Sequence, residues 1–155
     1  MAADFAVRRA TMDDAEAIGA LLHDFNTEFG DYTPGPDALA ARFRTLLSGR
    51  DTAVLLGGGT PCGLAVLRFR PAIWTEALEC YVAELYVVPD QRGRGLGRSL
   101  LEAALDFARE HGADRIELGT SEDDVAARAL YESAGFTNRE LGPEGPVMFV
   151  YEREL

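Results

Sequence analysis

The chain has 155 residues, a length typical of one domain, and its 47% hydrophobic and 26% charged composition is that of a globular protein. Because 26 acidic residues outnumber 15 basic ones and the net charge is −11, we expect a surface that repels nucleic acid and anionic lipid. The sequence has no apolar run near the roughly 20 residues that span a bilayer, and no signal core at its start, so we expect a cytoplasmic protein without a membrane partner.

The predicted elements alternate between strands and helices. Apolar spacing and turn residues indicate, in chain order, a strand at 5–9, helices at 13–23 and from Asp37, strands at 52–56, 62–69 and 79–88, a helix from Leu96, a strand at 115–118, a helix at 124–134, and strands from Phe136 and at 147–153. This order predicts a mixed α/β fold in a single domain, residues 4–155, with a central twisted mixed sheet of about six to seven strands flanked by about four helices.

A glycine-rich turn lies between the long strand at 79–88 and the helix from Leu96. Residues 87–98 read Val-Val-Pro-Asp-Gln-Arg-Gly-Arg-Gly-Leu-Gly-Arg. Glycines allow a tight turn that brings several N–H groups toward one point, and the N-terminus of the following helix adds its positive dipole end. The pattern therefore predicts an anion site sized for a pyrophosphate, with positive charge at its rim from Arg92, Arg94 and Arg98.

Other phosphate and metal sites fit the residue spacing less well. No Gly-Lys-Ser/Thr follows the turn, and Gly93, Gly95 and Gly97 lack the third glycine three residues after the second that a dinucleotide site has. The two cysteines, Cys62 and Cys80, lack metal-type spacing, so we expect free thiols and no bound metal. A purely structural connection remains the alternative for the turn.

Two blocks of the sequence resemble the GNAT superfamily of acyl-CoA-dependent N-acyltransferases. Arg92, Gly95 and Gly97 match that family's pattern of Arg or Gln, two residues, Gly, one residue, and Gly or Ala. Residues 126–136, Ala-Ala-Arg-Ala-Leu-Tyr-Glu-Ser-Ala-Gly-Phe, resemble its alanine-rich helix that ends in Leu-Tyr-Glu and Gly-Phe. The resemblance covers nearly the whole chain in order and implies the GNAT fold.

The resemblance implies acetyl-CoA as co-substrate. Backbone N–H groups of the glycine turn would hold the diphosphate, and the strand end at 85–88 would splay from its neighbour, pair with the pantetheine amides and polarise the thioester carbonyl through an N–H at about Val87. The implied coenzyme positions are Leu85, Val87, Val88, Arg92, Gly93, Arg94, Gly95, Leu96, Gly97, Arg98, Ser99 and Asp124. Asp124 stands where many members have asparagine; an ionised carboxylate only accepts hydrogen bonds, so helix capping and contact with the incoming ammonium are alternatives.

Acetyl transfer to an amine needs an acceptor for the proton of an ammonium, whose reference pKa is about 10.4, and a donor for the leaving thiolate. Glu84 is the candidate base, because matching family members often carry an acidic residue there, and Glu79, further from the splayed strand end, is the second choice. A substrate-binding carboxylate, a paired surface charge and an ordered water as base stay open as alternatives. Tyr131, from the Leu-Tyr-Glu match, is the candidate acid, and packing of its ring on the sheet is the alternative.

Phe25, Phe29, Tyr32 and Asp123 are the candidates for the acceptor pocket, since the family builds one wall from its first helix pair and neighbouring loops. Aromatic residues there are also common in a core, and Asp123 is equally a helix cap. We expect an N-acetyltransferase that acts on the primary amine of a small cationic molecule by direct attack in a ternary complex. The alternatives are a protein N-terminal or lysine acetyltransferase and a non-catalytic acyl-CoA-binding regulatory domain. Dimers that pair through their C-terminal strands are common among similar proteins, so a homodimer stays open as an alternative to a single chain.

Overall fold

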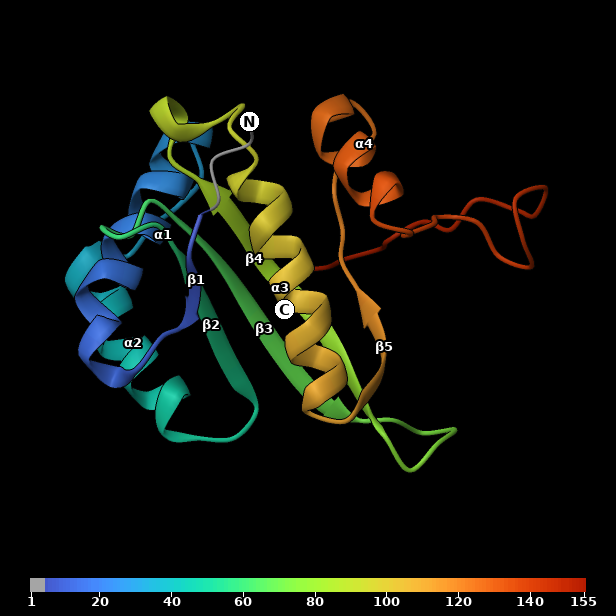
Figure 1. The fold of residues 1–155 in the computed structure, drawn as a ribbon, viewed down its shortest axis with the longest axis horizontal. Coiled ribbons are helices and arrows are strands. Elements are labelled where there is room, and N and C mark those ends of the chain that lie inside the picture. Colours follow the sequence, from blue (N-terminus) through green and yellow to red (C-terminus); the bar gives the residue numbers. More distant parts are fainter. Residues whose placement is uncertain (1–4) are drawn as a thin grey trace. The chain divides into compact units, whose positions relative to one another are not determined.

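The computed structural model describes residues 5–155, which form two compact units that divide between Leu118 and Gly119. The first unit carries one sheet in the order β1-β2-β3-β4-β5 (Figure 1). Its strands are β1 (Val7–Arg9), β2 (Thr52–Gly57), β3 (Gly63–Pro71), β4 (Leu78–Val87) and β5 (Ala113–Glu117). The first four strands pair antiparallel in chain order and β5 pairs parallel with β4, so the mixed sheet expected from the sequence is confirmed.

Three helices of the first unit cover the two faces of this sheet. α1 (Ala15–Phe29) and α2 (Pro36–Ser48) lie on one face and α3 (Leu96–Glu110) lies on the other (Figure 1). The fourth helix, α4 (Val125–Ser133), belongs to the second unit, and short 3-10 turns at Met12–Asp14 and Pro89–Gln91 lie before α1 and α3. The four helices expected from apolar periodicity are therefore all present.

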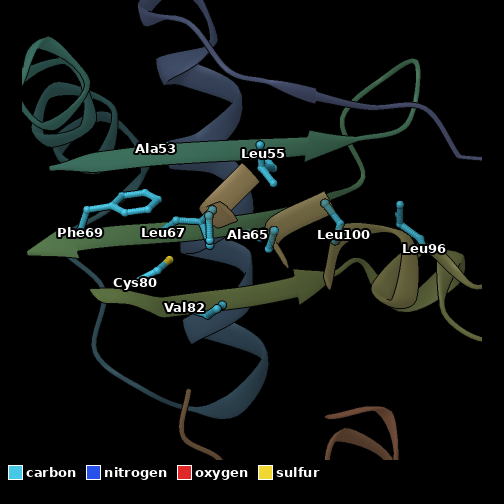
Figure 2. Close-up of a cluster of buried hydrophobic side chains, with 11 residues drawn as sticks. Ala53, Leu55, Ala65, Leu67, Phe69, Cys80, Val82, Leu96 and Leu100 are labelled. Carbon is cyan, nitrogen blue, oxygen red and sulfur yellow. The ribbon is translucent and has the colours of Figure 1, made fainter. Parts of the chain in front are cut away.

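The core is divided into two hydrophobic clusters, one on each face. Neighbouring residues of β3 alternate between them, because Leu67 packs toward α3 and Val66 toward α1 and α2. Figure 2 shows the α3 cluster, in which Leu96 and Leu100 of the helix lie with Leu67 and Ala65 of the strand. Because helices cover both faces, the central strands read as nearly continuous apolar runs.

A β-bulge in β4 reverses the faces to which its side chains point. Val66 of β3 pairs with Glu84 and the next residue, Leu67, pairs with Val82, so Ala83 is the extra residue. Before the bulge, Val82 packs in the α3 cluster, and beyond it the residues facing α3 are odd-numbered. The bulge therefore turns Glu84 to the face covered by α1 and α2, in agreement with the frequent use of bulges beside active sites.

The sheet of the described residues has five strands, so the expectation of six to seven is not confirmed. The segments expected as strands from Phe136 and at 147–153 form one isolated antiparallel bridge, between Arg139 and Val147. Phe149, Val150 and Tyr151 are 74%, 82% and 91% exposed. A strand requires a hydrogen-bonding neighbour as well as an apolar sequence, and within residues 5–155 this segment has only the single bridge.

The described part of the chain was also compared with the requirements for a membrane-spanning helix, a disulfide and a metal site. None of the helices in residues 5–155 is long and apolar enough to cross a membrane. Cys62 and Cys80 carry free thiols. No group of three or more His, Cys, Asp or Glu side chains in the same residues could hold a metal ion.

Gly19 of α1 generates a testable prediction on stability, because α2 approaches it closely. A Cβ at this position would lie 2.9 Å from the backbone nitrogen of Ala40 and closer still to the carbonyl oxygen of Pro36. Gly to Ala in an exposed helix is stabilising by about 1 kcal/mol. Here we expect Gly19→Ala to lower the free energy of unfolding by about 1–3 kcal/mol through overpacking, measured by urea denaturation.

Ala20 is the matched control, since it is the next residue of α1 and is exposed. Ala20→Gly tests helix propensity alone and should cost about 1 kcal/mol. A Gly19→Ala variant as stable as the wild type or more stable would contradict the close packing of α1 on α2.

Candidate functional site

The glycine-rich turn connects β4 to α3 and presents backbone rather than side chains. Gly93 and Gly95 have φ angles of 77° and 92°, in the left-handed region that other residues occupy at a cost. A Cβ added at either glycine would meet nothing within 4 Å, so the requirement for glycine is conformational. The turn therefore keeps open space directly in front of its backbone.

The N-terminus of α3 opens onto the same space. Gly95 occupies the N-cap position and has no side chain to cap the helix, and the first intrahelical bond of this turn runs from the Ser99 N–H to the Gly95 carbonyl at 3.0 Å. The first N–H groups of a helix lack intrahelical acceptors and carry the positive end of the dipole. This geometry suits an anion, which the backbone donors of residues 93–98 could bind.

β4 loses one neighbour before it reaches the turn. Its pairing with β5 ends at Tyr81 opposite Glu117, whereas β4 continues to Val87. Among the described residues, no strand pairs with this edge of β4 from Val82 onward. The Val88 N–H bonds to the Cys62 carbonyl on the β3 side, and successive strand residues direct their N–H groups to opposite sides, so the Val87 N–H points to the open edge.

Arg92 fixes the turn through its side chain. Its guanidinium donates two hydrogen bonds to the Glu28 carboxylate of α1, at 2.8 and 2.9 Å, and its Nε donates to the Val87 carbonyl at 2.9 Å. The Tyr86 hydroxyl donates to the same carboxylate at 3.0 Å, and the guanidinium lies over the Tyr86 ring. Hydrogen bonding from Arg92 holds the pKa of Glu28 below its usual value. The Arg92 side chain therefore ties α1 to the end of β4.

The remaining positions of the turn divide between the surface and the core. Arg94 and Arg98 are exposed, as expected of residues at the rim of an anion site. Leu96 is 1% exposed, and its side chain belongs to the α3 cluster, so only its backbone faces the turn. The guanidinium of Arg92 is paired with Glu28, and that of Arg94 donates a hydrogen bond of 3.4 Å to the neutral side-chain amide of Gln91.

Glu84 faces a cavity of about 190 Å³ between the sheet and the helix pair α1 and α2. Apolar residues of both helices line it, with Val66 of β3 and the polar side chains Asn26, Thr33 and Arg68. The Glu84 carboxylate makes no hydrogen bond or ion pair within residues 5–155, and burial raises its pKa. A half-buried carboxylate with a raised pKa in a cavity has the properties of a proton acceptor or an ammonium ligand.

The three aromatic residues expected in the acceptor pocket do not line this cavity. Phe25 stacks on Tyr86 at 4.7 Å between ring centroids, which is the core packing given as the alternative. Phe29 and Tyr32 are 60% and 83% exposed and do not line the cavity. Asn26 and Thr33, each next in sequence to one of these candidates, line it instead. A helix or loop position one residue away points in a different direction, which aromatic content alone does not reveal.

Three candidates lie in the second unit. The Asp124 side chain accepts a hydrogen bond from the Ala127 N–H at 3.1 Å, so it caps α4, the alternative to a coenzyme contact. Asp123 is exposed. Burial, and to a lesser degree the Asp124 charge, raise the pKa of Tyr131, whose ring lies 6.2 Å from that of Phe136.

Sequence reasoning missed two residues of the first unit, Glu28 and Arg68. Glu28 is 64 positions from its partner Arg92, and no local pattern connects them. Arg68 of β3 follows the apolar residues 63–67, at the even-numbered phase of Leu64 and Val66. A charge at the phase of buried apolar residues is the sequence signal that could have placed Arg68 in a cavity.

Comparisons with known proteins agree with this geometry. Residues 18–136 match the model of the acetyltransferase (GNAT) family. A candidate acetyltransferase of known crystal structure from Arthrobacter sp. FB24 is 48% identical, with a TM-score of 0.89 over 97% of this chain and 96% of that one. An uncharacterized N-acetyltransferase of Bacillus subtilis (strain 168) is 28% identical over 84% of this chain and 88% of its own length.

A mycothiol acetyltransferase of Beutenbergia cavernae is 44% identical over 69 residues, which are 43% of this chain and 23% of the relative. The chain thus spans about a quarter of the length of that relative. The family match, in contrast, covers most of the chain, including the glycine turn and the Leu-Tyr-Glu helix. The chain belongs to the GNAT family of acetyltransferases.

Proposed function

We propose that this protein transfers the acetyl group of acetyl-CoA to the primary amine of a small cationic molecule, by direct attack in a ternary complex. The observation that carries the proposal is the open edge of β4, which leads directly into the glycine turn at the N-terminus of α3. We treat residues 4–155 as one N-acetyltransferase domain, although residue 4 itself lies outside the described residues. The free thiols Cys62 and Cys80 suit a reducing cytoplasm.

The chemical groups of acetyl-CoA match the backbone groups that the turn and the edge of β4 expose. The diphosphate needs several N–H donors at one point, which the backbone of residues 93–98 offers. The pantetheine amides need a row of backbone partners, which the edge of β4 at Leu85 and Val87 offers. The Val87 N–H would then polarise the thioester carbonyl. Because these contacts are made by the backbone, we expect Gly93 and Gly95 to matter more for coenzyme binding than the side chain of Arg94 between them.

Glu84 is the proposed base and Tyr131 the proposed acid. The raised pKa of Glu84 makes the carboxylate a stronger base toward the ammonium of the acceptor. The Tyr131 hydroxyl has an ordinary pKa of about 10, which burial raises further, so it is protonated at neutral pH and has a proton to donate to the departing thiolate. The amine then attacks the thioester carbon, the C–S bond breaks, and the sulfur leaves as the thiol of coenzyme A.

A homodimer is part of the proposal. The exposed run Phe149, Val150 and Tyr151 is large and apolar, and exposed apolar runs of this kind are typical of contact surfaces. Within residues 5–155, β5 pairs on one edge only, and that free edge can receive a strand. Two copies would offer each other the same groups, as a two-fold interface requires.

The first prediction concerns the coenzyme. A side chain at Gly95 would enter the open space of the turn, so we expect Gly95→Val to weaken acetyl-CoA binding by about 10- to 100-fold, the equivalent of one hydrogen bond to a charged group. Isothermal titration calorimetry measures this. Gly30→Val is the matched control, because Gly30 also has a left-handed φ, of 73°, and lies at the end of α1. Equal affinity of Gly95→Val and the wild type would contradict the site.

The second prediction concerns the base. We expect Glu84→Gln to lower kcat by roughly 10²- to 10⁴-fold, the usual contribution of general-base catalysis, with little change in acetyl-CoA affinity. The wild-type kcat/KM should rise with pH through the Glu84 pKa, which burial raises, because only the ionised carboxylate accepts a proton.

That acid limb of the pH profile should vanish in Glu84→Gln. Glu79→Gln should keep it, since Glu79 is on the same strand but accepts a hydrogen bond from Arg70 at 2.8 Å. A Glu84→Gln enzyme with the wild-type profile would instead favour an ordered water as base. Acetyl-CoA binding without turnover of any amine or peptide would favour the non-catalytic alternative.

The third prediction concerns assembly. Light scattering coupled to gel filtration should give twice the mass of one chain for the wild type. Phe149→Ser combined with Tyr151→Ser should shift the protein toward one chain mass, because it removes apolar area from the proposed contact. Trp74→Ser is the control, as Trp74 is 94% exposed but lies in the β3–β4 connection. A wild type with the mass of a single chain would overturn the dimer.

A further inference from the structure

The cavity beside Glu84 contains two side chains of opposite charge. Glu84 of β4 and Arg68 of β3 both line it, and its other walls are apolar apart from Asn26 and Thr33. Arg68 also borders a neighbouring cavity of about 350 Å³ and is exposed, whereas Glu84 is half-buried. Arg68 therefore lies at the rim and Glu84 lies deeper.

Neither charge has a partner within the protein. Arg68 and Glu84 make no hydrogen bond or ion pair within residues 5–155, although the chain has 26 acidic residues. Neighbouring arginines are neutralised: Arg70 bonds to Glu79 and Glu117, and Arg92 bonds to Glu28. Two unlike, unpaired charges that line one cavity are suited to a ligand with both charges.

The strand register gives this pair a direction. Along the β3–β4 ladder, Arg68 lies opposite Tyr81, Val66 lies opposite Glu84, and Gly63 lies opposite Val87. The order from the rim is therefore Arg68, Glu84 and then the Val87 end, where the thioester is proposed. A ligand that spans the two charges with its ammonium at Glu84 directs its amine toward that end.

We propose that the acceptor is a small amino acid-like molecule, in which the amine is accompanied by a carboxylate that Arg68 binds. This rests on the proposed acetyl transfer and changes one property of the acceptor proposed above: the positive charge of its amine is balanced by a carboxylate. A guanidinium binds a carboxylate in a bidentate geometry, and it repels a second positive charge on the acceptor. Polyamines and other polycations are therefore poor acceptors.

The size and walls of the cavity define the rest of the molecule. A volume of about 190 Å³ is below the range of roughly 300–1,000 Å³ typical of pockets for drug-sized ligands. Leu22, Leu39 and Phe43 present an apolar wall from α1 and α2. An amino acid with an apolar side chain satisfies the two charges and this wall together.

The test compares acceptors with and without a carboxylate. Leucine, leucinamide and a polyamine are offered to the wild type with acetyl-CoA, and release of the coenzyme A thiol is followed. We expect kcat/KM for leucine to exceed that for leucinamide by about 10- to 100-fold, the usual contribution of a charge-assisted bidentate pair. In Arg68→Gln the ratio of leucine to leucinamide should fall toward one. Arg42→Gln, which removes an exposed charge of α2 outside the cavity, should keep the ratio.

Calorimetry with leucine alone separates this inference from the proposed reaction. Leucine that binds the wild type but not Arg68→Gln supports the zwitterion site even if no acetyl-CoA is consumed, in which case acetyl transfer fails and the site stands. Turnover of leucinamide or the polyamine at least as fast as leucine overturns the zwitterion site while acetyl transfer stands. Absence of leucine binding and turnover overturns it as well.

Discussion

The proposed coenzyme site depends on the loss of a strand partner by β4 after Tyr81. A sheet edge presents backbone N–H and C=O groups that must be satisfied by water, by another chain or by a ligand. Here the open edge runs into a turn whose glycines, Gly93 and Gly95, keep space in front of the helix N-terminus. An extended molecule with amides at one end and a diphosphate at the other meets both requirements, which is why coenzyme A suits this surface.

The ion pair of Arg92 with Glu28 gives that surface a fixed position. It connects α1 to the end of β4, and its additional hydrogen bond to the Val87 carbonyl leaves the N–H of the same residue available. The helix pair α1 and α2, the strand and the turn are thereby held together around the Glu84 cavity. The proposed coenzyme site and the proposed acceptor site thus share one strand, with Glu84 three residues from Val87.

The sequence predicts the parts of this arrangement that depend on neighbouring residues. Leu96, Leu100 and Ala104 recur at helical spacing, and the glycine turn is local, so both were predicted in place. The face of Glu84 depends on the bulge at Ala83, which is a property of pairing with β3 and not of β4 alone. The ion pair of Arg92 depends on Glu28, which lies 64 positions away in the sequence. The C-terminal strands were not confirmed for the same reason, since an apolar run such as 149–151 becomes a strand only beside a partner.

A crystal structure of the protein with acetyl-CoA bound tests the central claim most directly. We expect the diphosphate to lie against the backbone N–H groups of residues 93–98. The pantetheine arm should run along the open edge of β4, with the thioester near Val87. Coenzyme bound on another face, or a diphosphate held only by arginine side chains away from this backbone, would contradict it.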